Sequence, residues 1–504
     1  MPPTMLPSLP LARLRALPRP ELMRLGRAAG AFLDVAGTAT GRATFYNTQR
    51  EQAAAEANTH EALFDLSPEV YVALASLPGT TDHTRILTIG TVLGRTARVP
   101  IEHLVEALPP QRMFRLFDQL RHQRVNNART RRVILRSILD SHRLELWSVK
   151  YRRKMARALR HALGRRRASV LASILNKTDR TGHERGMLAR ELERHSRLRA
   201  GLVHECVAFV FGKETGLTLD LLRRYRAAKS DLDAAEGLPP EVIGGLRSTY
   251  HKDVDPAAAL RLSRHSMTSG QRLRVQARAA RANVRVDFDP RRHSPVELYI
   301  YAYERGLSEA IERALDEQAK ALAAKLPFAY ARIGILLDSS ASMAGHATQA
   351  LRPMASALAT RDVLMAAADE AVVYASSGQS DRRLVRPEGD TSLAAGLVEL
   401  LRRGCDAVFV LTDGYENAPA GRFAETMARI RELDIATPVY QASPVFGAEA
   451  GGLRRLAADH VPALPVARPE AFGLALLRGL FDVDPLPALE AVQRLLLHGK
   501  EKIR

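Results

Sequence analysis

The chain has 504 residues, of which 46% are hydrophobic and 26% are charged. This length allows two or three domains with buried cores, and this composition excludes a chain that is disordered throughout. The sequence has no run of the roughly 18–20 apolar residues that a membrane span requires, and two cysteines exclude a disulfide framework. Arginines interrupt the apolar residues of the first 20 positions, so we expect a cytoplasmic protein without a signal peptide.

Basic residues are concentrated in the first part of the chain. Of 74 basic and 55 acidic residues, residues 331–504 hold 19 and 21, which leaves 55 basic and 34 acidic residues for positions 1–330. Arg accounts for 64 of the basic residues. Arg binds phosphates through paired N–H groups and stacks on bases. A GC-rich genome would explain the high ratio of Arg to Lys equally well, but not the confinement of the excess to one region.

The first 325 residues contain two kinds of segment. Residues 1–40 have six prolines before position 21, and we expect them to form a loosely packed lead-in. Within residues 41–325, apolar residues recur three and four positions apart from about residue 60 onward, which is typical of helices. Short breaks separate the helical segments. We therefore predict an all-helical domain that stacks like HEAT repeats, although no sequence repeat is visible.

Residues 329–504 alternate between apolar strands and helical segments. The predicted strands are residues 331–337, 371–374, 407–411 and 438–440. Such alternation is typical of a parallel sheet with helices on both faces. Ligands of these sheets bind at the carboxyl ends of the strands, near the switch in strand order. The predicted fold class is thus α + α/β, with a helical array followed by a doubly wound sheet.

Oxygen-bearing side chains follow the predicted strands. An Asp-x-Ser-x-Ser pattern follows the first strand, Thr-Asp-Gly follows the third, and a Gly-Asp-Thr-Ser loop lies between them. Oxygen-only ligand sets suit Mg²⁺, and also Mn²⁺ or Ca²⁺. Two alternatives remain open: the serines cap the next helix, or Asp390 replaces Thr391 as the ligand of its loop. The candidate metal ligands are Asp338, Ser340, Ser342, Thr391 and Asp413.

Catalysis at these residues is not expected. A phosphatase with an aspartyl nucleophile would need a second carboxylate two residues after Asp338, where this chain has Ser340. The chain also has no phosphate-binding loop, HExxH or G-x-S-x-G motif in a convincing setting. We therefore predict a protein that is not an enzyme.

Two clusters of basic residues lie in the helical region. Residues 121–170 contain 16 basic and two acidic residues, and residues 256–286 contain seven arginines and no acid. Like charges one helical turn apart repel each other, and phosphate groups would neutralise them. The alternative is a solvated helix face whose ionic partners lie elsewhere in the fold. The candidate RNA-binding residues are Arg131, Arg132, Lys150, Arg152, Arg153, Lys154, Arg157, Arg160, Arg165, Arg166, Arg167, Arg264, Arg272, Arg274 and Arg278.

The sequence also resembles known families. The strand-end pattern and residues 329–504 as a whole resemble the von Willebrand A domain with its metal-ion-dependent adhesion site, which implies that the five candidate ligands bind the metal directly or through water. A basic helical region followed by such a domain resembles the TROVE family, in particular the Ro autoantigen and its bacterial counterparts. The segments that carry this second likeness are residues 286–306, 308–326, 333–343, 411–417 and 429–438 and, less specifically, residues 238–268.

The TROVE resemblance implies a ring of helical repeats that the A domain closes. It implies that small structured RNAs of the Y type bind the outer surface, that 3′ ends of misfolded noncoding RNAs enter the hole, and that an exoribonuclease is tethered through the RNA. We expect no membrane association and no DNA specificity. The main hypothesis is a non-enzymatic RNA-binding scaffold or quality-control protein. The alternative is an adaptor, for example of an ATPase complex, whose metal binds an acidic residue of a protein partner without RNA.

Overall fold

The computed structural model describes residues 8–39, 49–326, 330–345, 350–444, 454–457 and 460–501. The chain divides into two compact units that are interleaved in sequence. Unit 1 comprises residues 1–88, 98–104 and 290–504, and unit 2 comprises residues 89–97 and 105–289. This division differs from the predicted boundaries at residues 41 and 329, because the first helices of the chain group with the C-terminal sheet.

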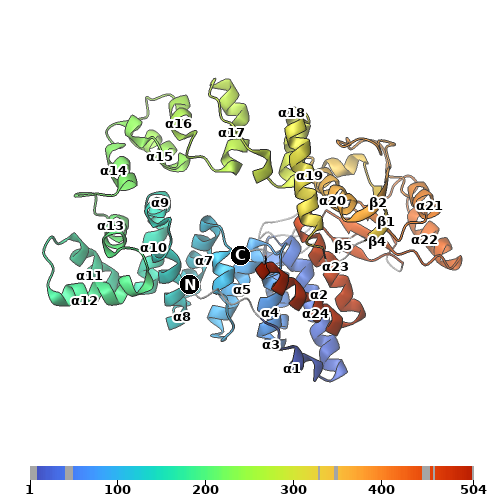
Figure 1. The fold of residues 1–504 in the computed structure, drawn as a ribbon, viewed down its shortest axis with the longest axis horizontal. Helices are drawn as coiled ribbons and strands as arrows, with labels where there is room; N and C mark the ends of the chain where they lie inside the picture. The colour runs from blue at the N-terminus through green and yellow to red at the C-terminus, as the bar shows by residue number, and fades with distance from the viewer. Residues whose placement is uncertain are drawn as a thin grey trace. The chain divides into compact units, whose positions relative to one another are not determined.

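Helices make up most of both units (Figure 1). Unit 1 contains α1 (Leu11–Arg15), α2 (Arg19–Thr38), α3 (Gln49–Leu66), α4 (Pro68–Ala75), α18 (Pro295–Arg305), α19 (Glu309–Ala323), α20 (Arg352–Ala366), α21 (Ala394–Arg402), α22 (Arg422–Glu432), α23 (Phe472–Val483) and α24 (Pro485–Glu501). Helices α5 (Asp82–Gly94) and α6 (Glu102–Glu106) contribute residues to both units. Unit 2 contains α7 (Pro110–His122), α8 (Ala128–Leu139), α9 (Leu144–Lys150), α10 (Arg152–Leu163), α11 (Arg165–Asn176), α12 (Gly182–Glu191), α13 (Ala200–Val210), α14 (Asp220–Ala227), α15 (Pro240–Tyr250), α16 (Pro256–Ser263) and α17 (Ser269–Arg281).

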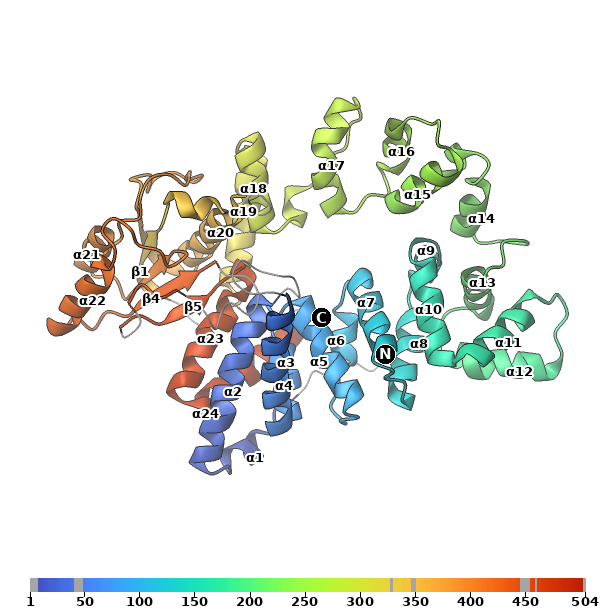
Figure 2. The ribbon, with the colours of Figure 1, turned by 180° about the vertical axis from the view of Figure 1, so that it is seen from behind.

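The sheet of unit 1 is parallel throughout and has the strand order β2-β1-β3-β4-β5. Figure 2 labels β1, β4 and β5 of this sheet. Its strands are β1 (Tyr330–Leu337), β2 (Ala368–Ala375), β3 (Ala407–Leu411), β4 (Val439–Ser443) and β5 (Ala463–Pro465). The strand order reverses between β1 and β3, so the carboxyl ends of these two strands flank the switch point. The predicted parallel sheet with flanking helices is confirmed. Strand β5 was missed, because it has only three residues and one of them is proline.

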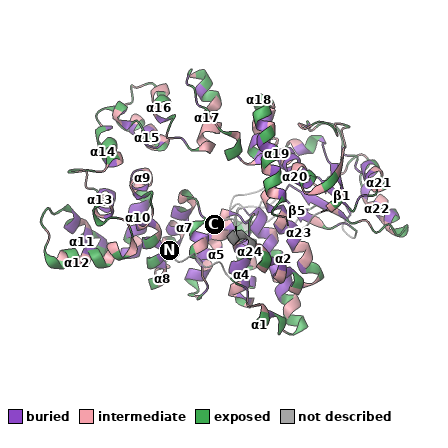
Figure 3. Ribbon diagram, in the orientation of Figure 1, coloured by how far each residue is buried: buried purple, intermediate pink, exposed green. Residues whose placement is uncertain are grey.

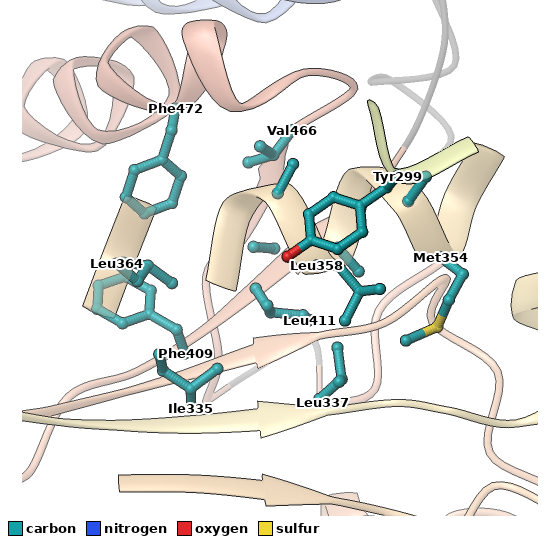
Figure 4. Close-up of a cluster of buried hydrophobic side chains, with 14 of the residues drawn as sticks. Tyr299, Ile335, Leu337, Met354, Leu358, Leu364, Phe409, Leu411, Val466 and Phe472 are labelled. Atoms are coloured by element: carbon teal, nitrogen blue, oxygen red, sulfur yellow. The ribbon is translucent and has the colours of Figure 1, made fainter. Parts of the chain in front are cut away.

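Helices cover both faces of this sheet, as its alternating side chains require. On one face, Ile335 and Phe409 belong to a buried cluster that also includes Tyr299 of α18 and Phe472 of α23 (Figure 4). On the other face, Leu336 packs with residues of α21 and α22. Burial on both faces fixes the register of β1 and β3, and with it the positions of the loops that follow them.

Helix α2 is packed, in contrast to the loose lead-in expected for residues 1–40, of which residues 1–7 and 40 lie outside the described part. Phe32 and Ala36 are fully buried, and α2 packs against α23 (Figure 1). A side chain at Gly26 would lie 2.3 Å from Pro485, so the glycine permits close approach. Asp34 forms an ion pair with Arg478 of α23 at 3.2 Å. Helix α2 is thus part of a core that the C-terminal helix α23 completes.

Unit 2 has its own hydrophobic interior, drawn as buried residues in Figure 3. Trp147, the only tryptophan of the chain, is 9% exposed and packs edge-on against Phe114, with ring centres 5.9 Å apart. Trp147 is therefore a core residue. In the part of the chain that the structure describes, no helix combines the length and the apolar character needed to cross a membrane.

Candidate functional site

Three loops of unit 1 meet at the switch point of the sheet. The first follows β1 and begins at Asp338, the second contains Thr391, and the third follows β3 and contains Asp413. The amide of Ala341 in the first loop donates to the carbonyl of Gly389 in the second at 3.0 Å. The amide of Ala418 in the third loop donates to the carbonyl of Thr391 at 3.2 Å. Backbone hydrogen bonds thus hold the three loops together.

Asp338 is the buried centre of these loops. One carboxylate oxygen accepts from the amide of Ser340 at 3.0 Å, and the other accepts from the hydroxyl of Thr412 at 2.6 Å. Burial raises the pKa of Asp338 above its usual value, hydrogen bonds from Thr412 and Ser340 oppose this rise, and the negative charge of Asp413 adds to it. The carboxylate is therefore held in place beside a second acid.

The two serines bring hydroxyl oxygens together. The Oγ atoms of Ser340 and Ser342 are 3.1 Å apart. Ser340 precedes a short 3₁₀ helix, Ala341–Ala344, but within the described residues its side chain accepts no capping hydrogen bond from that helix. Ser342 lies within that helix, and a hydrogen bond from it lowers the pKa of Asp413. Ser340 therefore does not cap this helix through its side chain.

Thr391 and Asp390, both in the second loop, differ in burial. Thr391 is 1% exposed, and its amide donates to the side-chain oxygen of Asn417 at 2.8 Å. Asp390 is exposed, and its carboxylate lies 3.4 Å from the side-chain nitrogen of the same Asn417. Thr391 is therefore the buried member of this pair.

The residues of these loops fit a hard divalent cation. Burial raises the pKa of Asp413, while a hydrogen bond from Ser342 and the charge of Arg454 lower it. A cation would favour the ionised forms of Asp338 and Asp413, and hydroxyl oxygens are suitable neutral ligands. Among the described residues, no group of three or more His, Cys, Asp or Glu could hold a metal, so any site here depends on the hydroxyls. Sequence reasoning missed Thr412 as a partner of Asp338, although it directly follows β3.

A large cleft in unit 2, here called the basic cleft, has a volume of about 1080 Å³. It combines seven cationic side chains with two acidic ones and three tyrosines. The cations are Lys150, Arg152, Arg153, Lys154, Arg157, Arg160 and Lys229, the acids are Glu214 and Glu241, and the tyrosines are Tyr151, Tyr225 and Tyr250. Six of the seven cations are among the predicted RNA-binding residues.

Some cations of the basic cleft have structural partners. Arg152 donates to Glu214 at 2.6 Å and to the carbonyl of Phe209 at 3.0 Å, and its guanidinium lies 4.0 Å from the Phe209 ring centre. Lys150 pairs with Glu241 at 3.1 Å. Lys150 ends α9 whereas Lys154 lies on α10, so the two lysines belong to different helices. Glu214 and Glu241 are distant in sequence from the cations that they pair with. For Arg152 and Lys150, the structure therefore agrees with the alternative of a helix face whose ionic partners lie elsewhere in the fold.

The other cations of α10 are exposed. Arg153, Lys154, Arg157 and Arg160 all point away from the interior, because Met155, Ala156, Ala158 and Leu159 occupy its buried face. Arg157 is 3.8 Å from Asp118, and Arg160 lies 5.5 Å from the ring centre of Phe211. Within the described residues, Arg153 and Lys154 have no acidic partner. These four side chains are available to an anion in solution.

A second cleft in unit 2 has a volume of about 540 Å³. Its charged residues are Arg131, Arg132, Arg136, Arg167, Arg194, Arg197, Asp140 and Glu191. Asp140 pairs with Arg197 at 2.8 Å, and Arg167 is 3.9 Å from Glu191. Three predicted RNA-binding residues, Arg131, Arg132 and Arg167, are thus brought together here rather than in the basic cleft.

Three helices of unit 2 begin with cations. Their first four residues read ARTR in α8, RRKM in α10 and RRRA in α11. The N-terminus of a helix carries partial positive charge, so cations there are unfavourable and anions are favoured. Arg165 and Arg166 belong to this group and are exposed. The arrangement weakens each helix start unless a negatively charged ligand binds nearby.

The second predicted cluster, residues 256–286, contributes to neither cleft. Arg272 donates to the carbonyls of Met267, Asp287 and His265 at 3.1–3.2 Å, which is a structural role. Arg264 and Arg274 are exposed, and each bonds to a near neighbour in sequence. Arg278 is exposed as well. The structure therefore separates this cluster from the cations of α8, α10 and α11.

No family model matches this chain, and no curated protein matches it. The features that bear on its function are therefore the two clefts of unit 2 and the strand-end loops of unit 1.

Proposed function

We propose that this protein is a non-enzymatic RNA-binding protein that uses the basic cleft to hold the phosphate backbone. The observation that carries the proposal is the excess of seven cations over two acids around one cleft, together with three tyrosines. Phosphate charge gives affinity through counterion release, and aromatic rings add sequence-tolerant stacking. The cationic helix starts favour the same class of ligand.

The proposal extends to the kind of RNA and its use. By its resemblance to the TROVE family, the protein would bind small structured, Y-like RNAs and misfolded noncoding RNAs in the cytoplasm, as a scaffold or quality-control component. An exoribonuclease held through the RNA is the expected partner. The HEAT-like repeat and the ring remain predictions of the same resemblance.

Purification without nuclease tests this function first, since a bound RNA raises the 260/280 absorbance ratio and can be sequenced. Binding of a labelled structured RNA is then measured by fluorescence anisotropy for the wild type and for the double variant Arg153→Glu/Lys154→Glu. We expect affinity to fall at least tenfold, because two phosphate contacts are replaced by repulsion. Arg190→Glu/Arg223→Glu is the matched control, since both arginines are exposed in unit 2 and lie outside both clefts. Equal losses in the two double variants would refute a specific cleft.

A second candidate function is metal-dependent binding of a protein partner at the loops that contain Asp338 and Asp413. The observation that favours it is the gathering of the buried carboxylate of Asp338, the half-buried carboxylate of Asp413 and two serine hydroxyls at the switch point of the sheet. Mg²⁺ would complete this set and accept an acidic side chain of the partner. Calorimetric titration with Mg²⁺ tests it: Ser342→Ala should weaken binding, whereas Ser392→Ala, an exposed serine in the same group of loops, should not.

A further inference from the structure

The second cleft of unit 2 holds more positive charge than its acids can neutralise. Six arginines and two acidic residues line its volume of about 540 Å³, which leaves four positive charges in excess, without counting His195. The arginines come from α8, from α11 and from the segment that follows α12. The hydroxyl of Ser196 in that segment donates to the carbonyl of Leu139 in α8 at 2.6 Å. Two walls of the cleft are therefore joined, and guanidinium groups from three parts of the chain surround one small space.

The two acids of this cleft already have basic partners. The carboxylate of Asp140 accepts from the amide of Arg197 at 2.8 Å and from its guanidinium at 3.0 Å. Glu191 lies 3.9 Å from Arg167, which is a long ion pair. Neither acid is thus left over to neutralise the arginines of α8.

Arg132 and Arg136 carry the excess charge of α8. They lie one helical turn apart and are both exposed. Neither forms a hydrogen bond or an ion pair with any other residue that the structure describes. Burial lowers the pKa of His195, and the charges of both arginines lower it further, so they act on a residue of another wall of the cleft. Like charges at this spacing weaken a helix, and an anion between them would remove that cost.

The residues around this cleft suit phosphate groups without bases. In the described part of the chain, no Phe, Tyr or Trp lines it, whereas three tyrosines line the basic cleft. The rings on which bases stack are therefore missing. An RNA strand carries one negative charge per nucleotide and spreads its charge along the chain. A triphosphate group concentrates about four negative charges at neutral pH, and paired N–H groups of arginine match its oxygens.

We propose that the second cleft is a binding site for a compact triphosphate group, which the arginines of α8 and α11 hold. Such a group occurs at the 5′ end of an unprocessed RNA and in free nucleoside triphosphates, and both sources present the same chain of phosphates. The RNA source rests on the proposed function, whereas the site itself does not. In either case the cleft recognises phosphate and leaves the base unread.

Calorimetric titration of the full chain with inorganic triphosphate tests the site. In Arg132→Gln/Arg136→Gln the affinity should fall roughly tenfold or more, because two charged hydrogen-bond donors are lost. Arg167→Gln changes a different helix and should also weaken binding. Arg278→Gln/Arg281→Gln is the matched control, since both arginines are exposed on α17 and lie outside both clefts. Circular dichroism checks that the helices are retained. Equal affinity in the wild type and Arg132→Gln/Arg136→Gln, or an equal loss in the control, would overturn the site.

Two RNAs of one sequence, one with a 5′ triphosphate and one with a 5′ hydroxyl, distinguish the sources. If the RNA end is the ligand, the wild type should prefer the triphosphate RNA roughly fivefold or more, and Arg132→Gln/Arg136→Gln should abolish the preference. Equal affinities for the two RNAs, with inorganic triphosphate still bound, would assign the cleft to free nucleotides.

The basic-cleft variant Arg153→Glu/Lys154→Glu separates this site from the proposed function. It should weaken binding of both RNAs and leave the affinity for inorganic triphosphate unchanged. A wild type that binds RNA but no inorganic triphosphate would overturn the site and leave the proposed function standing. A wild type that binds inorganic triphosphate but no RNA would overturn the proposed function and leave the site standing.

Discussion

Unit 1 buries charged groups and pairs them, whereas α10 of unit 2 exposes charges of one sign. In unit 1, Arg361 is 4% exposed and donates to Asp362 at 2.8 Å and to the carbonyls of Arg382 and Arg383. In unit 2, Arg153 and its neighbours on α10 face solvent. The stability that depends on buried ion pairs changes with pH and with the loss of either partner, whereas the interactions of exposed charges weaken as salt is added. The same abundance of arginine thus serves stability in one unit and, as we propose, binding in the other.

Loss of Asp362 should have the largest effect. Asp362→Asn leaves the buried guanidinium of Arg361 without its counter-charge, and it also weakens contacts from Tyr299 and Arg383. We expect a loss of about 3–5 kcal/mol in the free energy of unfolding of unit 1. Urea unfolding followed by circular dichroism measures it. Fluorescence of Trp147 reports on unit 2 alone, and an equal shift of that signal would show that the units do not respond separately.

Added salt should weaken RNA binding at the basic cleft more than Mg²⁺ binding at the loops that contain Asp338 and Asp413. If the four exposed cations of α10 contact phosphates, raising salt from 50 to 200 mM should lower RNA affinity roughly 50-fold for a single strand and roughly 150-fold for a duplex. The affinity for Mg²⁺ should change much less, because Asp338 is fully buried and screened weakly. Anisotropy and calorimetry at the two salt concentrations measure these changes. An RNA affinity that is independent of salt would contradict phosphate binding.

Acid should destabilise unit 1 through His60. This residue is 2% exposed, shares a 2.6 Å hydrogen bond with Tyr71, and has a pKa lowered to about 3, first by burial and then by the charge of His83. Between the unfolded pKa of about 6.5 and the folded value, the unfolded state binds more protons, so stability falls as pH falls. From pH 7 to pH 5 we expect His60 to cost about 2 kcal/mol.

Asp34 should oppose this loss. Burial raises its pKa to about 6, so between the unfolded value of 3.8 and about 6 the folded state binds more protons and gains stability as pH falls. Its gain from pH 7 to pH 5 is about 1 kcal/mol. Urea unfolding at both pH values measures the contributions of His60 and Asp34 to the free energy of unfolding. On acidification, His60→Gln should lose less stability than the wild type, and Asp34→Asn should lose more. The reverse order would show that the signs are wrong.

The exposed cations of α10 should have the smallest effect on stability. Arg153 and Arg157 are one turn apart and repel each other, so Arg153→Ala should stabilise unit 2 by a few tenths of a kcal/mol. Arg152→Ala removes the contacts with Glu214 and Phe209 and should cost about 1–3 kcal/mol. Thermal unfolding followed by Trp147 fluorescence compares the two. A large loss in Arg153→Ala would mean that this residue is structural as well.

Local patterns predicted the sheet well. The strands of 331–337 and 407–411 have continuous apolar runs, and the polar residues after them reach the switch point, as parallel topology requires. The partners of cations could not be predicted in this way. Glu214, which binds Arg152, is 62 positions away in sequence, so only the fold identifies it. Nor did any glycine or proline mark the break at Tyr151 between α9 and α10.

The packing of α2 on α23 has a consequence for biosynthesis. Helix α2 ends at Thr38 and its partner begins at Phe472, so the ribosome must add 434 residues before α23 starts to emerge. At roughly 5–20 residues per second this takes on the order of 20–90 s. During that interval the face of α2 that carries Gly30 and Gly37, and that packs on α23 in the folded protein, has no native cover. Nascent chains that stall before α23 should therefore recruit chaperones or aggregate, even when unit 2 has already folded behind α2.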